Sequence, residues 1–126
     1  MNLEEATKRI TLEYIKTGCK GYQTLLKYIN SKMTASLFLA NTKVSYLPED
    51  LKVGGWLDLR NTPITSLPKD LKVGGHLFLE NTPITTLPED LNVGKDLYLG
   101  NTPINEKYTI QELRQMLPNV KGSIYS

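Results

Sequence analysis

Histidine and carboxylate side chains are the residues of this 126-residue chain best suited to acid–base chemistry. We expect the single histidine, His76, to lie near Asp58, Glu80 and Asp96. A histidine beside a carboxylate can activate a nucleophile, but no serine or cysteine has a defined position next to this one. We therefore expect no catalytic residue, and we predict that the protein is not an enzyme.

The three aspartates Asp50, Asp70 and Asp90 recur at twenty-residue intervals and are the best candidates for a metal site. A calcium ladder needs paired oxygen ligands and glycine-rich spacing, whereas one acid per interval offers neither. We expect these carboxylates to cap nearby backbone N–H groups. The sequence therefore predicts no metal and no cofactor.

Cys19 is the only cysteine, so an intramolecular disulfide is excluded and a reducing compartment is favoured. We interpret it as a small apolar side chain that fills a turn, in preference to a reactive thiol. The chain has no apolar run long enough to span a membrane, and its acidic start lacks the zones of a secretory signal. We expect a cytoplasmic protein of the producing or infected cell.

A repeat organises most of the chain. Residues 57–76 and 77–96 are identical at thirteen of twenty positions, which marks a repeat protein. The pattern Leu-x-Leu-x-Asn-Thr starts at Leu37, Leu57, Leu77 and Leu97. In the fourth unit, Thr109 and Glu112 predict a capped helix over 110–117. Residues 120–125 then match the spacing of 73–78, which predicts a final strand after a seven-residue insertion.

Helical periodicity dominates residues 1–36. Asn2 and Glu5 predict a reciprocal cap for a helix over 3–17. Ala6, Ile10 and Tyr14 form its apolar stripe, and we expect Ile15 to widen that stripe. A second apolar face begins near Tyr22 and runs to Met33. These segments predict a helical hairpin that covers the open end of a solenoid.

The pattern Leu-x-Leu-x-x-Thr-x-Ile-x-x-Leu-Pro resembles the leucine-rich repeat, in particular the short, twenty-residue type with a Leu-Pro motif that occurs in bacteria and their phages. The resemblance covers residues 37–126, and the whole chain is similar in architecture to non-enzymatic leucine-rich-repeat effectors with an N-terminal helical hairpin. It implies an α/β fold: a leucine-rich-repeat solenoid of about five rungs with a short-stranded parallel concave sheet, a helical hairpin cap and a helix inserted in the last rung. We expect a single domain over 1–126, with the cap in 1–36, the rungs in 37–107 and the final helix and strand in 108–126.

One departure from that family concerns the turn after each strand. The family's usual asparagine aligns with Thr62, Thr82 and Thr102, and an asparagine precedes each of these threonines. Both side chains can satisfy turn backbone groups. The sequence leaves open whether the threonines or the preceding asparagines form the turn ladder.

The residues that alternate with the repeat leucines are the candidate binding site. Because successive strand residues point to opposite faces, these side chains face solvent while the leucines face the core. Aromatic residues on a solvent-facing sheet are typical of an interface, although rings can also simply pair across strands. We expect Arg60 and Glu80, as lateral neighbours, to form an exposed ion pair. The predicted partner-binding residues are Phe38, Trp56, Asp58, Arg60, His76, Phe78, Glu80 and Tyr98.

These features predict a protein–protein interaction module that binds a partner protein through its concave aromatic face. By resemblance, we expect a phage or bacterial protein that inhibits or scaffolds a host protein. Self-association as a homodimer is an alternative, because an exposed aromatic patch suits a two-fold contact. A second alternative is nucleic-acid binding by basic residues of the hairpin, although the net charge of the chain is only +2. Those basic residues are Lys8, Arg9, Lys16, Lys20, Lys27 and Lys32.

Overall fold

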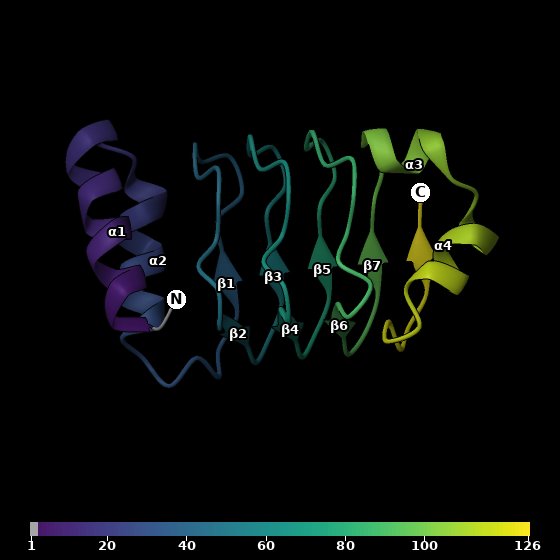
Figure 1. The fold of residues 1–126 in the computed structure, drawn as a ribbon, viewed down its shortest axis with the longest axis horizontal. Helices are drawn as coiled ribbons and strands as arrows, with labels where there is room; N and C mark the ends of the chain where they lie inside the picture. Colours follow the sequence, from purple (N-terminus) through teal and green to yellow (C-terminus); the bar gives the residue numbers. More distant parts are fainter. Residues whose placement is uncertain (1–2) are drawn as a thin grey trace.

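Two antiparallel helices, α1 (Leu3–Thr17) and α2 (Lys20–Ile29), form an N-terminal hairpin (Figure 1). The computed structural model describes residues 3–126, so the predicted cap at Asn2 lies outside the described residues. Gly18 ends α1 with a positive φ of 69°, and its N–H donates to the Tyr14 carbonyl at 2.8 Å. This glycine stop agrees with the prediction.

The second helix begins near Tyr22, as predicted, but ends earlier than predicted. It begins two residues before Tyr22 and ends at Ile29, so Met33 lies beyond it with a left-handed φ of 54°. The Asn30 side chain donates to the Leu26 carbonyl at 2.9 Å and so satisfies a group at the helix end. Met33 instead behaves like a repeat position, because its carbonyl accepts from Gly54 N–H as the Val53 carbonyl accepts from Gly74 N–H.

The hairpin packs its apolar faces onto the start of the repeats. Ala6 and Ile10 of α1 and Leu25 of α2 are fully buried. The prediction for Ile15 is wrong, since 74% of this residue is exposed. Ile15 follows Ala6 by nine residues, which is about two and a half helical turns. It therefore lies on the side of α1 opposite to Ala6.

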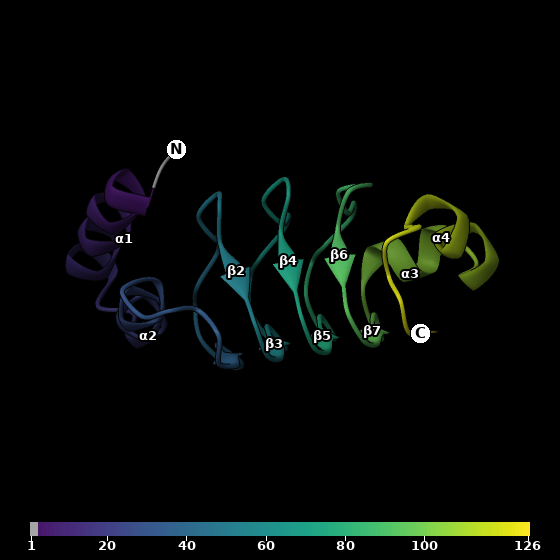
Figure 2. The same ribbon diagram turned by 90° about the horizontal axis from the view of Figure 1, so that it is seen from below.

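Short parallel strands build a solenoid after the hairpin. The five-stranded sheet has the order β1 (Leu37–Phe38), β3 (Leu57–Asp58), β5 (Leu77–Phe78), β7 (Leu97–Tyr98) and β8 (Ile124–Tyr125). A three-stranded sheet on an adjacent side contains β2 (Lys52–Val53), β4 (Lys72–Val73) and β6 (Asn92–Val93) (Figure 2).

The register of these strands confirms the sequence repeat. Leu37 pairs with Leu57, Leu57 with Leu77, and Leu77 with Leu97, so successive turns of the solenoid are twenty residues long. Leu97 then pairs with Ile124, which confirms the final strand and the longer last connection. The repeat leucines, isoleucines and valines form one continuous buried core, except that Leu87 is only partly buried and packs against it.

The turn after each strand uses both residue types that the sequence left open. Thr62 is buried, and its hydroxyl donates to the Leu59 carbonyl at 2.8 Å; Thr82 and Thr102 make the equivalent bond. Asn61 takes the left-handed conformation, with a φ of 57°, and its side-chain amide donates to the Asn41 side chain at 2.7 Å. The threonine thus closes each turn from inside, and the asparagine supplies its backbone shape and links turns outside.

Glycine is required where turns approach one another most closely. A Cβ atom at Gly74 would collide with the carbonyl oxygen of Gly54, and one at Gly94 would collide with that of Gly74. Gly54 N–H, Gly74 N–H and Gly94 N–H each donate to the preceding turn. The recurring glycine therefore brings the turn backbones within hydrogen-bonding distance of each other.

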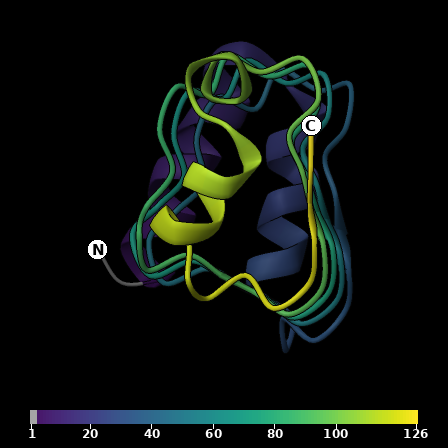
Figure 3. The same cartoon turned by 90° about the vertical axis from the view of Figure 1, so that its right-hand side faces the viewer.

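Two helices cover the C-terminal end of the stack. In Figure 3, which looks along the stack, the turns superpose on one outline and α4 (Ile110–Met116) lies across it. The predicted capping box is present: Thr109 N–H donates to Glu112 Oε1 at 2.9 Å, and Glu112 N–H donates to Thr109 Oγ1 at 3.1 Å. Leu113 is fully buried.

The preceding helix, α3 (Pro103–Lys107), was not predicted from the sequence. Thr102 caps it by accepting from Asn105 N–H at 3.3 Å, and Pro103 occupies its first turn. In earlier turns a second proline, such as Pro68, holds the residue before it extended. No proline follows Pro103 until Pro118, so the segment after Pro103 can form a helix. Among residues 3–126, no helix has the length and apolar character needed to cross a membrane.

Candidate functional site

The solvent-facing side of the five-stranded sheet brings the predicted binding residues together. Leu57 and Leu59 point into the core with no exposed surface, so the residues between and beside them point outward. The same alternation holds in every strand because the register repeats. We call this surface the aromatic face and define it as Phe38, Trp56, Asp58, Arg60, His76, Phe78, Glu80, Tyr98 and Tyr125.

A row of stacked rings runs across the C-terminal half of the aromatic face. The Phe78 and Tyr98 rings are 4.8 Å apart between centroids with an interplanar angle of 13°, and Tyr98 and Tyr125 are 4.9 Å apart at 19°. Trp56 meets the Phe78 ring at 5.8 Å in an edge-on arrangement. The rings therefore pair across strands, and this pairing stabilises the sheet.

Exposure differs among the rings of this face. Phe38, Trp56 and Tyr125 are 59%, 45% and 47% exposed, whereas Phe78 and Tyr98 are half-buried. Burial, together with the nearby Asp96 carboxylate, raises the pKa of the Tyr98 hydroxyl above its usual value. Tyr98 has a stacked ring on each side and Phe78 has one stacked neighbour, so this row presents mainly ring edges and hydroxyl groups to solvent.

Asp58 and Arg60 form a fixed ion pair beside the rings. Arg60 Nε donates to Asp58 Oδ1 at 2.9 Å and Arg60 Nη2 donates to Asp58 Oδ2 at 2.7 Å. These bonds raise the pKa of the Arg60 guanidinium. They also correct the predicted pairing of Arg60 with Glu80, because residues two apart in a strand lie on the same face and Asp58 is the closer carboxylate. Asp58 is only 5% exposed as a result.

Arg60 also connects the ion pair to the rings. Its guanidinium carbon is 5.3 Å from the Phe78 ring centroid, which is within the range of a cation–π contact. Glu80, on the next strand, is half-buried. The aromatic face therefore carries one fixed, partly exposed positive group next to its central rings.

His76 is held by its neighbours on the same face. Its Nδ1 accepts from Asp96 N–H at 3.2 Å, and the Asp96 carboxylate Oδ2 lies 3.6 Å from the same nitrogen. The other Asp96 oxygen accepts from Ser123 N–H at 2.8 Å. His76 also contacts the Trp56 ring edge-on at 5.1 Å. These contacts give His76 a role in ordering the face.

Comparisons with known proteins add no assignment to this geometry. No model of a protein family, no curated protein and no solved structure matches the chain.

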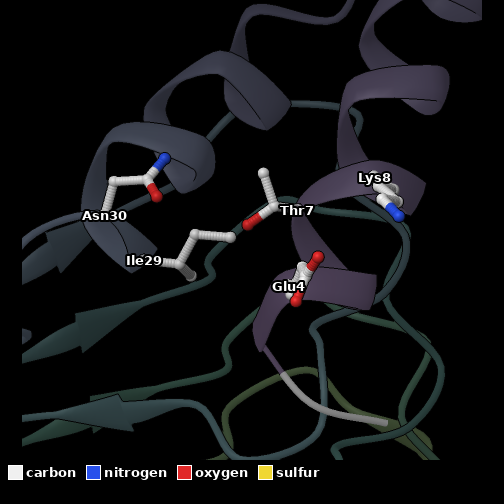
Figure 4. Close-up of a pocket in the computed structure, with 5 residues that line it drawn as sticks. All are labelled: Glu4, Thr7, Lys8, Ile29 and Asn30. Carbon is white, nitrogen blue, oxygen red and sulfur yellow. The ribbon is translucent and has the colours of Figure 1, made fainter.

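One hollow of the described residues lies between α1 and α2, away from the aromatic face. Its volume is about 370 Å³, and Figure 4 shows Thr7 and Ile29 facing each other across it, with Glu4 and Lys8 on α1 and Asn30 on the other side. The lining contains a single carboxylate and a single amine. It brings together no pair of nucleophile and base.

Basic residues of the hairpin are exposed but point into different surroundings. Lys8, Lys20 and Lys27 line three separate hollows. The Arg9 guanidinium lies 4.9 Å from the centroid of the Tyr46 ring and is therefore engaged within the protein. Cys19 is half-buried and packs against the core, as expected for a small apolar filler.

The aspartate column lies on another side of the solenoid. Asp70 N–H donates to Asp90 Oδ1 over a long 3.5 Å, and Asp50 and Asp70 both have positive φ angles. Within residues 3–126 no group of three or more histidine, cysteine or acidic side chains is arranged to hold a metal ion. The bond from Asp70 N–H to Asp90 thus crosses between turns, whereas we expected local caps.

Proposed function

We propose that this protein is a non-enzymatic binding module of the leucine-rich-repeat type, which engages a partner protein through its aromatic face. The observation that carries the proposal is the row of partly exposed rings from Trp56 to Tyr125 on a rigid sheet. Core packing requires the repeat leucines but does not require aromatic residues on the solvent side. Tryptophan and tyrosine are also the residues that contribute most often to binding energy at interfaces.

The geometry of the face favours a protein surface over a sugar or a nucleic-acid base. Sugars and bases bind aromatic side chains by lying flat on them. Tyr98 is stacked between Phe78 and Tyr125, and the Phe78 ring has Tyr98 stacked on it and the Arg60 guanidinium nearby. Their edges, the tyrosine hydroxyls and the Arg60 guanidinium suit apolar side chains flanked by a carboxylate.

The proposed setting follows from the resemblance of the repeat. Leu-Pro pairs at 47–48, 67–68 and 87–88 and the twenty-residue register are typical of the short bacterial and phage type. We propose that the protein acts in the cytoplasm of the producing or infected cell, where it inhibits or scaffolds a host protein.

Paired alanine variants test this proposal. Trp56→Ala combined with Phe78→Ala removes two rings of the face, whereas Ile15→Ala removes a more exposed apolar side chain from α1. Each tagged protein is incubated with host lysate, and captured proteins are quantified by mass spectrometry, with circular dichroism to check folding. We expect the double variant to lose a partner that the wild type and Ile15→Ala both retain. Equal capture by all three would contradict the proposal.

Self-association is the second use of the same face that the exposed rings favour. A two-fold contact would place the aromatic faces of two copies against each other. Light scattering over a concentration series measures the mass of the wild type and of the double variant. A dimer that the wild type forms and the double variant does not form would identify a second copy of this chain, instead of a foreign protein, as the partner.

A further inference from the structure

A groove lies where the helical hairpin meets the first strand of the five-stranded sheet. Its volume is about 340 Å³, and Figure 1 shows α2 running alongside β1. One wall is a single stripe of α2, with residues at helical spacing, and the other is the segment that leads into β1. The lining residues are Thr24, Lys27, Tyr28, Ser31, Ala35, Ser36, Leu37 and Phe38.

The edge of β1 beside this groove has unused backbone groups. Leu37 N–H donates to the Trp56 carbonyl at 2.8 Å and Leu39 N–H to the Asp58 carbonyl at 2.9 Å, both on β3. In a parallel ladder the intervening residue points its N–H and C=O to the opposite side. Phe38 N–H and the carbonyls of Phe38 and Ser36 therefore face away from β3, and none of them takes part in a backbone hydrogen bond of the described residues.

The pairing of β1 with β3 shows what this edge can accept. β3 turns the backbone groups of Asp58 towards β1, where they meet Leu37 and Leu39. β1 turns the equivalent groups of Phe38 towards the groove, but the neighbouring element there is α2, whose own backbone bonds are made within the helix. The groove is therefore bordered by a strand edge in the same arrangement that binds a strand elsewhere in the sheet.

Side chains give the groove a defined floor and one charge. Tyr28 is 7% exposed, and its hydroxyl donates to the Ala35 carbonyl at 2.7 Å, which fixes the chain that leads into β1. Phe38 has no ring neighbour among the described residues and is the most exposed ring of the aromatic face. Lys27 is the one charged residue in the lining. The site therefore combines an apolar floor, a free strand edge and a positive charge.

We propose that an extended peptide segment of another protein adds as a strand to β1 in this groove, with an apolar side chain against Tyr28 and Phe38 and a carboxylate facing Lys27. Main-chain hydrogen bonds to Phe38 and Ser36 supply affinity, and the two side-chain contacts supply selectivity. The inference goes beyond the proposed function and shares only Phe38 with the aromatic face, so the two sites are separable by mutation.

Peptide selection with a matched pair of variants tests this site. Phage-displayed random peptides are selected on the full chain, and enriched peptides are synthesised and titrated by fluorescence anisotropy. Thr24→Trp fills the groove, whereas Gln23→Trp places the same ring on an exposed neighbouring position of α2 outside the lining. We expect Thr24→Trp to weaken binding by at least ~10-fold and Gln23→Trp to leave it unchanged. Selection that yields no peptide, or equal affinities for both variants, overturns the proposal.

Charge and backbone provide two further readouts. Lys27→Glu should weaken the binding of acidic peptides by a factor of about 3–10, and the loss of affinity should be larger at low salt than at high salt. Amide exchange followed by NMR should show Phe38 N–H exchanging quickly in the free protein and slowly with peptide bound. A bound peptide that leaves Phe38 exchange unchanged overturns strand addition.

Other occupants give distinct results. A peptide that is lost with Trp56→Ala and Phe78→Ala, but is unaffected by Thr24→Trp, binds the aromatic face; this outcome overturns the groove and supports the proposed function. A dimer in light scattering that Thr24→Trp abolishes identifies a second copy as the occupant and overturns a foreign peptide. If only peptide binding in the groove is disproved, the proposed binding through the aromatic face is unaffected.

Discussion

In two columns of this solenoid, similar side chains lie beside one another in successive turns, with opposite effects on stability. On the aromatic face, Phe78, Tyr98 and Tyr125 stack with centroids 4.8 and 4.9 Å apart. On another side, Asp70 and Asp90 are also neighbours one turn apart. Rings at this spacing attract one another, whereas carboxylates at this spacing repel. The repeat that strengthens one column thus weakens the other.

The repeats differ from one another in the residues of the aromatic column. Ring can follow ring in the aromatic column because each added ring gains a stacked contact. The column is interrupted at Asp58, which pairs with Arg60 and separates Phe38 from the other rings. The C-terminal part of the aromatic face is therefore stabilised by its own stacking, and Phe38 stands apart from it.

The largest effect is expected when the middle of the ring stack is removed. Tyr98→Ala deletes the contacts with both Phe78 and Tyr125, so we expect the free energy of unfolding to fall by about 1–2 kcal/mol. Urea unfolding followed by circular dichroism measures this change. Tyr125→Ala, which removes a single stacked contact, should cost less. Equal costs for the two variants would show that stacking does not stabilise this column.

The ion pair beside the stack should give the next largest effect. Asp58→Ala removes two hydrogen bonds to a half-exposed guanidinium, and we expect a cost of ~1 kcal/mol because solvent screens the exposed partner. Arg60→Ala should cost a similar amount. The double variant should cost clearly less than the sum, because both single changes break the same pair. Additive costs in urea unfolding would mean that the two residues act independently.

Much of the solenoid was predictable because its spacing is exact. Leu37, Leu57, Leu77 and Leu97 pair in register, and the match of residues 120–125 to 73–78 located the last strand. A buried column requires the same residue type at the same position in each turn, so the sequence repeats where the core repeats. The family resemblance beyond this parallel-strand solenoid stays a prediction.

Features that depend on contacts with a single neighbour were not predictable in the same way. Ile15 belongs to an apolar series in the sequence, but its angle on α1 turns it to solvent. The predicted Arg60–Glu80 pair was wrong because Asp58, two positions before Arg60 and on the same face, is the closer carboxylate. The Thr102-Pro103 signal for α3 was available, but the same pair is followed by extended chain in earlier turns.

The isolated ring should contribute little to stability. Phe38→Ala removes a side chain that is 59% exposed and has no ring neighbour among the described residues, so we expect a change within ~0.5 kcal/mol. Replacing Asp58 by phenylalanine would fill the interruption in the column. In that background Phe38→Ala should cost more, and urea unfolding of the four proteins measures the difference. The same cost in both backgrounds would show that the column gains nothing from continuity.

The smallest effect is expected in the acid column, where the contribution of Asp70 to stability depends on pH. A hydrogen bond and charge repulsion from Asp90 raise the pKa of the Asp70 carboxyl above its ordinary value of 3.8, whereas the Asp90 pKa is lowered. A carboxyl with a raised pKa binds its proton more tightly in the folded state. Its contribution to stability is therefore complete below the ordinary pKa and is lost as pH rises through the raised value.

Asp70→Asn tests this directly, because asparagine keeps a donor for Asp90 at every pH and tolerates the positive φ of 64°. We expect the variant to match the wild type in acid, where Asp70 already carries a proton, and to be the more stable of the two at neutral pH. Urea unfolding at both pH values measures the difference, with Asp50→Asn as the control because Asp50 is not one of the charged groups that shift the Asp70 pKa. A difference that does not grow with pH would mean that the acid column carries no repulsion, and the contrast with the aromatic column would then rest on the rings alone.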